Sequence, residues 1–156
     1  MFFLARSSKG GLDILGEPVL LEFEVKPLDF LAAGEAAEHV KETLKTLGLP
    51  SDICRRAAVV AYEAEMNLVI HGGGGRMVLR VEEDRITIIA VDKGPGIPDL
   101  SLAMQEGYST APDYIREMGF GAGMGLSNIK RNSDELEIDT KIGEGTKLVS
   151  VIYIKQ

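Results

Sequence analysis

Two polar residues, Glu63 and Asn67, stand four positions apart in the stretch AYEAEMNLVIH. If this stretch is a helix, side chains four apart lie on one side of it, about 40° from each other. The pair flanks the apolar positions Val60, Ala64 and Leu68, so we expect both side chains to be partly buried at the margin of the core. Polar groups in such a place are paired or take part in chemistry. An exposed helix face with ordinary polar neighbours is the alternative that the helix alone leaves open.

A second candidate, Asp92, comes directly after the apolar stretch ITIIAV and begins the pattern D-x-G-x-G with Gly94 and Gly96. The apolar stretch predicts a central strand, so this carboxylate would lie at the strand's carboxyl end. Glycines let the backbone that follows approach a ligand closely, and an ionised carboxylate only accepts hydrogen bonds. The combination suits recognition of a base edge, but many tight turns share the same pattern.

Alternating glycines precede a predicted helix in the run GFGAGMG, at Gly119, Gly121, Gly123 and Gly125. Backbone amides in such a run can cradle phosphates, and the dipole of the following helix attracts anions. The run is neither a Walker A loop, which needs Gly-Lys-Ser/Thr, nor a Rossmann fingerprint. A flexible linker would also be rich in glycine. Further on, GEGT is typical of a hairpin turn, and its threonine, Thr146, could help to close a nucleotide pocket.

Apolar periodicity predicts the elements that must hold these residues. We expect a helix capped by Asp29 with core positions from Phe30 to Leu47, and a second helix from Ser51, its N-cap, to about His71. The other predicted elements are strands at 18–25, 77–81 and 85–91, short helices near 100–106 and 126–133, and a hairpin of 135–141 with 146–155. Helices on one face of these strands give an α+β fold, a two-layer α/β sandwich whose sheet is mixed but mostly antiparallel.

Length and composition limit the possible classes of protein. A chain of 156 residues, 45% apolar and 26% charged, is typical of one globular domain, which we place at residues 18–156 after an amino-terminal extension, 1–17, of unknown role. The net charge of −7 argues against nucleic acid as the main partner. The single cysteine, Cys54, excludes an internal disulfide and a cysteine-based zinc site. We find neither a signal peptide nor an apolar run that could span a membrane, and therefore expect a cytoplasmic protein.

The order of the motifs resembles a known family. E-x-x-x-N on a helix, D-x-G-x-G-I after a strand, G-x-G-x-G before a helix and then G-x-G-T form the motif series of the GHKL ATP-binding superfamily. That group includes gyrase, heat-shock chaperones, sensor histidine kinases and the mismatch-repair protein MutL. The stretches DKGPGIPDLSLAMQEGYST and GFGAGMGLSNIKRNSDELEIDTKIGEGTKL look most like its small bacterial anti-sigma factors and stressosome switch kinases. The resemblance covers residues 18–155 and implies the Bergerat-type ATP-binding fold; the HGGGG run at 71–75 lies outside the family pattern.

The resemblance also implies a chemical role for the first motif. Glu63 would be the general base that takes the proton from a serine or threonine hydroxyl of a partner protein as that oxygen attacks the γ-phosphate of ATP. Asn67 would hold Mg²⁺ through its amide oxygen. Glu65 is only two residues from Glu63, about 160° away on a helix, and should point elsewhere.

The other motifs would bind the nucleotide. In the resemblance, Asp92 accepts a hydrogen bond from the adenine amino group, and residues 108–125 form a lid over ATP. Arg116 would contact the γ-phosphate, and Thr146 would bond near the adenine. The remaining contacts would come from Gly94, Gly96, Ile97, Gly121, Gly123, Met124 and Gly125.

The implied activity is that of an ATP-dependent serine/threonine-protein kinase in a bacterial partner-switching system. Its partners would be an antagonist protein of the STAS type, a sigma factor, or both, and a homodimer would fit the family. An ATP-gated binding switch, or an anti-sigma factor without significant kinase activity, is the alternative. Glu63 argues for chemistry, because binding alone needs no base.

Overall fold

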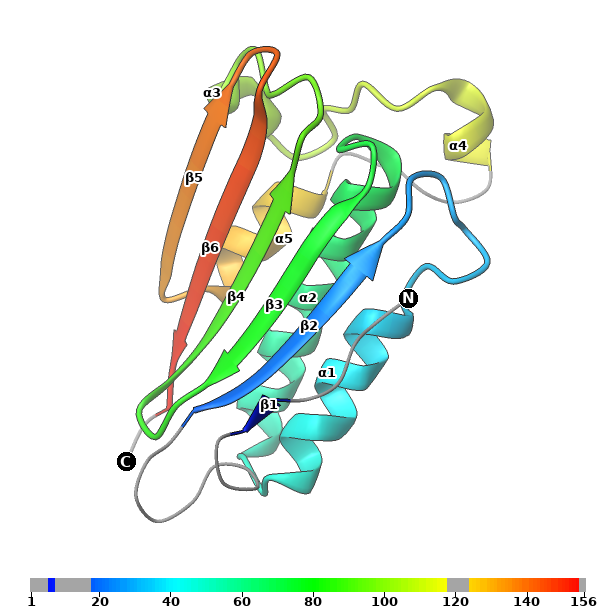
Figure 1. Ribbon diagram of the computed structural model, residues 1–156. Coiled ribbons are helices and arrows are strands. Elements are labelled where there is room, and N and C mark those ends of the chain that lie inside the picture. Colours follow the sequence, from blue (N-terminus) through cyan, green and yellow to red (C-terminus); the bar gives the residue numbers. More distant parts are fainter. Residues whose placement is uncertain (1–5, 8–17, 118–123, 155–156) are drawn as a thin grey trace.

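The computed structural model describes residues 6–7, 18–117 and 124–154. Within these residues the chain forms one six-stranded sheet in the order β1-β2-β3-β4-β6-β5 (Figure 1). Every described pairing is antiparallel. The sequence analysis expected a mixed sheet, and that part of the expectation is wrong for the described strands. The strands are β1 (Arg6–Ser7), β2 (Val19–Val25), β3 (Gly75–Val81), β4 (Arg85–Asp92), β5 (Glu135–Lys141) and β6 (Gly145–Tyr153).

Three helices cover one face of the sheet, as Figure 1 shows: α1 (Glu35–Thr46), α2 (Ser51–Ile70) and α5 (Gly125–Asn132). A helical layer on one antiparallel sheet is the two-layer α+β sandwich expected from the sequence. Two short helices, α3 (Leu100–Ala103) and α4 (Asp113–Glu117), lie between β4 and α5 in the chain. Five residues are too few to show a helical period, which is why α4 was not predicted. No helix in the described residues is both long and apolar enough to cross a membrane.

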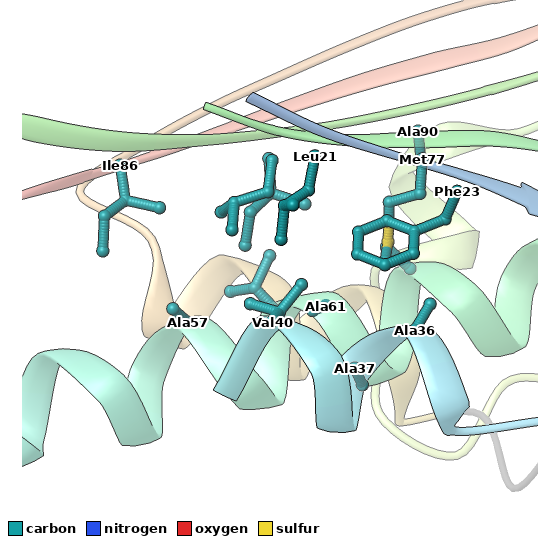
Figure 2. Close-up of a cluster of buried hydrophobic side chains, with 14 of the residues drawn as sticks. Leu21, Phe23, Ala36, Ala37, Val40, Ala57, Ala61, Met77, Ile86 and Ala90 are labelled. Atoms are coloured by element: carbon teal, nitrogen blue, oxygen red, sulfur yellow. The ribbon is translucent and has the colours of Figure 1, made fainter. Parts of the chain in front are cut away.

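The core lies between the sheet and the helical layer. Alternate residues of each strand point to the inner face, so Leu21 and Phe23 of β2 are buried while Glu24 is exposed. Figure 2 shows side chains of the inner face opposite residues of the helices: Leu21, Phe23, Met77, Ile86 and Ala90 face Ala36, Val40, Ala57 and Ala61. The alanines let the helices approach the sheet closely. Each large apolar side chain buried here stabilises the fold by about 1.5–3 kcal/mol.

Helix α1 begins later than the sequence predicts. The expected cap, Asp29, instead accepts a hydrogen bond from the backbone N–H of Ala32 at 3.2 Å, and residues 30–34 form turns. The helix starts after Gly34, whose positive φ of 98° is a left-handed conformation that most residues avoid. Phe30 still packs against the core, so the apolar positions were identified correctly although the helix begins five residues further on.

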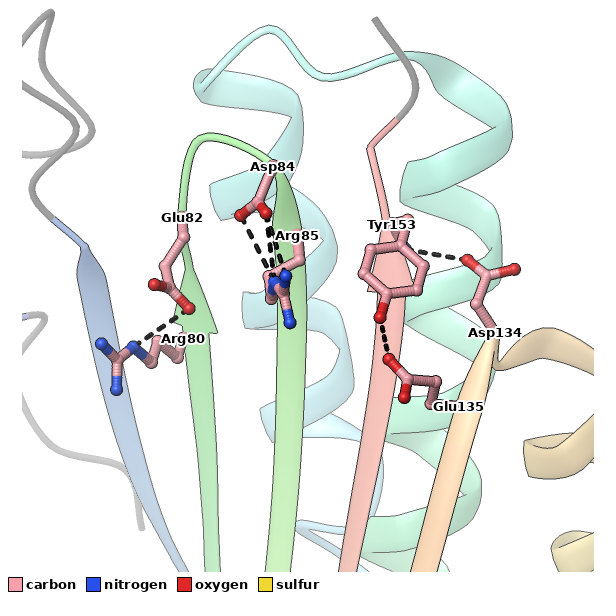
Figure 3. Close-up of polar contacts among 7 residues, drawn as sticks. All are labelled: Arg80, Glu82, Asp84, Arg85, Asp134, Glu135 and Tyr153. Carbon is pink, nitrogen blue, oxygen red and sulfur yellow. Dashed lines mark hydrogen bonds and ion pairs between the residues drawn. The ribbon is translucent and has the colours of Figure 1, made fainter.

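The end of the sheet at the β3–β4 turn is polar and solvent-exposed (Figure 3). Asp84 pairs with Arg85 at 3.0 Å, and the Arg85 guanidinium lies over the ring of Tyr153 at 5.0 Å from its centroid. The backbone N–H of Tyr153 donates to Asp134 at 2.8 Å. Exposed ion pairs of this kind contribute little to stability. Asp92 lies at the opposite end of β4.

Part of the expected amino-terminal extension pairs with the sheet. Arg6 and Ser7 form β1, which lies antiparallel to β2 with Arg6 opposite Leu20 and Ser7 opposite Val19. This pairing gives β2 a neighbour on its outer side, so these two residues are part of the sheet.

Candidate functional site

A cavity of about 400 Å³ opens where α2, the carboxyl end of β4, the loop after it, α5 and β6 meet. This volume lies in the range of sites that take small molecules and cofactors. Residues from all four motifs border it, although up to 83 positions separate them in the chain: Glu63, Asn67, Asp92, Gly96, Ile97, Met124, Gly125 and Thr146. The fold thus brings together the candidates that the sequence places far apart.

Asp92 is half-buried at the end of β4, and its two carboxylate oxygens have different surroundings. Oδ1 accepts hydrogen bonds from the backbone N–H groups of Gly94, at 2.9 Å, and of Thr146, at 3.1 Å. Among the described residues, Oδ2 has no hydrogen-bond donor. Because an ionised carboxylate can only accept, Oδ2 is available to a donor group on a ligand in the cavity.

Glycines surround Asp92 because the backbone there is packed too tightly for side chains. A Cβ on Gly72 would lie 2.8 Å from Asp92 Oδ2, and one on Gly94 would lie 2.8 Å from the carbonyl oxygen of Gly72. Gly145 is as constrained, since its Cβ would lie 2.3 Å from the Asp92 carbonyl oxygen. The HGGGG run, which the family pattern did not explain, supplies this close contact through Gly72.

Thr140 contacts two residues of the cavity, Ile97 and Thr146, and the sequence analysis did not identify it. Its hydroxyl accepts the backbone N–H of Ile97 at 2.8 Å and lies 2.9 Å from the hydroxyl of Thr146. The loop after β4 is thereby fixed to the β5–β6 hairpin. Thr140 stands in a strand with exposed charged neighbours, Asp139 and Lys141, so nothing local distinguishes it from an ordinary edge residue.

Glu63 and Asn67 are half-buried on α2, and both border the cavity, as their position beside the core stripe predicts. The first residue of α5, Gly125, lies against Asn67, since a Cβ there would be 3.3 Å from Asn67 Oδ1. The N-cap of α5, Met124, makes no side-chain hydrogen bond to the first turn. Amides at a helix start that no described side chain caps, next to a carboxamide oxygen, fit a phosphate group together with Mg²⁺, which prefers oxygen ligands and keeps several waters.

Glu65 points away from the cavity, as expected, and is 3% exposed. Its carboxylate accepts hydrogen bonds from the first amides of α1: Gly34 at 3.0 Å, Ala36 at 3.3 Å and Ala37 at 3.0 Å. Burial raises the pKa of Glu65, and these three donors oppose that rise. This residue of α2 therefore serves as the N-terminal cap of α1, a structural role that only the tertiary fold reveals.

Part of the predicted lid borders the cavity through Tyr108, Ser109 and Thr110. Further along the same segment, Ala111 and Ile115 are buried. Three of the predicted phosphate contacts lie outside the part of the chain that the structure describes: Gly121, Gly123 and the side chain of Arg116.

Comparison with known proteins agrees with the resemblance seen in the sequence. Residues 54–156 match the family model described as histidine kinase-, DNA gyrase B-, and HSP90-like ATPase. The chain is 30% identical over 131 residues to serine/threonine-protein kinase RsbT of Bacillus subtilis (strain 168), which covers 81% of this chain and 90% of that protein. It is also 30% identical over 131 residues to the anti-sigma F factor of Clostridium acetobutylicum, covering 78% of this chain and 88% of that one.

A solved structure supports the fold. The structure of the SiaB–SiaC complex from Pseudomonas aeruginosa contains a chain that superposes with a TM-score of 0.57 at 19% identity, over 85% of this chain and 88% of that one. The matched family region contains every cavity residue from the four motifs, and the similarity to RsbT extends over most of both chains. The chain belongs to the histidine kinase-, DNA gyrase B- and HSP90-like ATPase family.

Proposed function

We propose that this protein is a regulatory serine/threonine-protein kinase of a bacterial partner-switching system, acting in the cytoplasm. It transfers the γ-phosphate of Mg·ATP to a serine or threonine of an antagonist protein of the STAS type. The observation that carries the proposal is the Glu63 carboxylate at the wall of the cavity, one helical turn from Asn67. The similarity to a protein named serine/threonine-protein kinase RsbT supports it.

The adenine base would lie at the Asp92 end of the cavity. Its exocyclic amino group would donate to Oδ2, the oxygen that the backbone leaves available. Guanine carries a carbonyl at that position, and two acceptors facing each other would disfavour its binding. The contact between Thr140 and Ile97 would hold the loop at the distance that the base requires.

The phosphates would lie between Asn67 and the start of α5. Asn67 Oδ1 would be the protein ligand of Mg²⁺, and the first amides of α5, after Met124, would donate to phosphate oxygens. Bound there, Mg²⁺ would neutralise charge on the phosphate oxygens during transfer. Gly121, Gly123 and Arg116 are proposed as further contacts of this end of the nucleotide.

Glu63 would accept the proton from the hydroxyl of the partner's serine or threonine. The hydroxyl oxygen forms a bond to the γ-phosphorus, the bond from that phosphorus to the bridging oxygen breaks, and ADP leaves with the electron pair. The proton remains on the Glu63 carboxylate until it passes to solvent. The reaction thus needs a carboxylate at the cavity wall, whereas nucleotide binding does not.

An ATP-gated binding protein is the second candidate function. Its support is the similarity to proteins named anti-sigma F factor, which suggests a sigma factor as the ligand. In this case ATP would order the surface around the cavity, and that surface would hold the sigma factor without phosphate transfer.

Labelled ATP separates the two functions. The protein is incubated with Mg²⁺, [γ-³²P]ATP and the STAS-domain proteins and sigma factors encoded in the same genome. A Glu63→Gln variant should lose about 10²–10⁴-fold in transfer to a STAS-domain protein and keep its ATP affinity within a few-fold. Glu83→Gln, at the exposed β3–β4 turn, is the matched control and should transfer normally. A protein that labels no partner but binds a sigma factor only with ATP would be the binding protein instead.

A further inference from the structure

We propose that Asn128, on α5, is a positioning residue that orients the Glu63 carboxylate for proton transfer. The inference rests on the proposed function of Glu63. The side-chain Nδ2 of Asn128 donates to Glu63 Oε2 at 2.5 Å, across 65 positions of the chain. Among the described residues Asn128 is not one of those that border the cavity, so it acts on the reaction only through Glu63.

The orientation of the Asn128 amide is determined by its two partners. On one side the Glu63 carboxylate can only accept hydrogen bonds; on the other, the Arg131 guanidinium can only donate them. Arg131 Nη2 donates to Asn128 Oδ1, which leaves Nδ2 to face Glu63. An amide placed between an acceptor and a donor satisfies both in one orientation only, so the contact to Glu63 is specified by the chemistry of its neighbours.

Arg131 is itself held by an ion pair with Glu106, the residue two positions before Tyr108. Tyr108 borders the cavity at the start of the predicted lid. The four side chains Glu63, Asn128, Arg131 and Glu106 therefore form one continuous chain of hydrogen bonds. It joins the proposed base to the residues that precede the predicted lid.

The contact with Asn128 makes the surroundings of the two Glu63 carboxylate oxygens different. Oε2 is held by Asn128, while Oε1 has no hydrogen-bond partner among the described residues. A carboxylate fixed at one oxygen loses rotational freedom and presents the other in a constant direction. Oε1 is then the atom that would accept the hydroxyl proton, and Asn128 is the reason that it stays in place.

The sharpest variant is Asn128→Asp, which keeps the size of the side chain and the acceptor for Arg131 but replaces the donor to Glu63 by a second carboxylate. We expect turnover to fall about 10–100-fold, because misplacement of a reacting group by about 1 Å can cost a factor of 10². ATP affinity should stay within about threefold, since Asn128 does not border the cavity. Asn132→Asp adds the same charge one turn later on α5, where Nδ2 donates to the backbone carbonyl of Asn128, and should turn over normally.

Turnover is measured in two ways: phosphate release from Mg·ATP, with water as the acceptor, and transfer to the STAS-domain partner. A double-mutant cycle then tests whether Asn128 acts through Glu63. In the Glu63→Gln background, Asn128→Asp should cause no further loss, because its target is already gone. If the double variant instead loses turnover by the product of the two single-variant losses, Asn128 acts independently of Glu63 and the inference is overturned.

A spectroscopic readout tests the contact without turnover. The side-chain amide resonances of Asn128 in a ¹H–¹⁵N spectrum should move in Glu63→Gln and stay in place in Glu83→Gln. Normal turnover in Asn128→Asp, together with loss in Glu63→Gln, would refute the inference alone. Normal turnover in Glu63→Gln would refute the assignment of the base and, with it, the task of Asn128. An intact protein that binds Mg·ATP and shows no turnover would refute the proposed function and this inference together.

Discussion

Gly72 lies so close to Asp92 that a methyl group on its Cα would be 2.8 Å from the Oδ2 oxygen and 2.9 Å from the Cβ of Asp92. The carboxylate that is proposed to bind adenine therefore depends on the absence of a side chain twenty residues earlier. Asp92 cannot simply swing aside, because its Oδ1 is fixed by the backbone of Gly94 and Thr146.

Gly72→Ala should weaken ATP binding by tenfold or more. The added methyl must displace the Asp92 carboxylate, and loss of one charged hydrogen bond costs about 1.5–3 kcal/mol. Calorimetry with Mg·ATP measures the change. Gly73→Ala is the control: its positive φ of 67° makes the substitution strained, but no atom of the described residues lies within 4 Å of the added Cβ, so stability should fall and affinity should not. Equal affinities of Gly72→Ala and the intact protein would contradict the placement of the base beside Asp92.

Asp92→Asn should lower ATP affinity about ten- to a hundredfold. The amide oxygen can still accept the N–H groups of Gly94 and Thr146, which leaves the NH₂ group facing the amino group of adenine, a donor against a donor. Competition between ATP and GTP checks the same contact, since the intact protein should prefer ATP. Asp84→Asn, at the other end of β4, should leave both affinities unchanged. Equal affinities of the intact protein for ATP and GTP would exclude this role of Asp92.

Asn67→Ala should remove the effect of Mg²⁺ on ATP binding. If Asn67 Oδ1 is the protein ligand of the metal, the affinity of the variant with Mg²⁺ should equal its affinity with EDTA, whereas the intact protein should bind more tightly with Mg²⁺. Titration of a fluorescent ATP analogue under both conditions gives the ratio. Asn132→Ala retains Asn67 and should retain the ratio. A Mg²⁺ effect of undiminished size in Asn67→Ala would place the metal ligand elsewhere.

Glu65→Gln should destabilise the fold and leave ATP binding intact. The two carboxylate oxygens of Glu65 accept from three backbone amides at the start of α1, whereas glutamine has only one oxygen. Its NH₂ group would face at least one of these N–H donors, which should lower the free energy of unfolding by about 1–3 kcal/mol. For a chain of this size we expect a fall in Tm of about 2–4 °C for each kcal/mol, measured by calorimetry. Glu38→Gln, on the exposed side of the first turn of α1, should change Tm by far less. An unchanged Tm in Glu65→Gln would mean that α1 does not depend on this cap.

The contribution of Glu65 to the free energy of unfolding should depend on pH. Because burial raises its pKa above the value of about 4.3 in an unfolded chain, the folded protein binds this proton more tightly than the unfolded one. The contribution of Glu65 to stability is then complete below the unfolded pKa and is lost as the pH rises through the folded pKa. The difference in unfolding free energy between the intact protein and Glu65→Gln should therefore shrink as the pH rises above the unfolded pKa of about 4.3. A difference that grows instead would show that the three amide donors outweigh burial.

The sequence predicted the elements whose pattern is local. The alternation in ELEIDTK gives the exact bounds of β5, and the apolar stripe of α2 places Glu63 and Asn67 at the core margin where the structure has them. Motif order was enough to predict that residues of all four motifs would share a cavity, because the family resemblance supplies the tertiary arrangement that spacing alone lacks; Gly94 borders Asp92 rather than the cavity.

The features that the sequence did not predict are contacts between distant segments. Asp29 is a good N-cap by type, yet α1 begins at Glu35 because Glu65 provides the acceptor for its first amides. Thr140 and Asn128 are ordinary polar residues in their own elements. Their importance appears only when the fold brings Ile97 and Glu63 next to them.

The capping of α1 by a residue of α2 also has a consequence for the order of folding. The first amides of α1 find their acceptor 28 to 31 positions later in the chain, so α1 is completed only once α2 has formed and docked. A peptide of this length without such a partner is marginally helical in water. We therefore expect the helix that carries Glu63 and Asn67 to form first and α1 to assemble against it, so that the wall of the cavity would precede the complete helical layer.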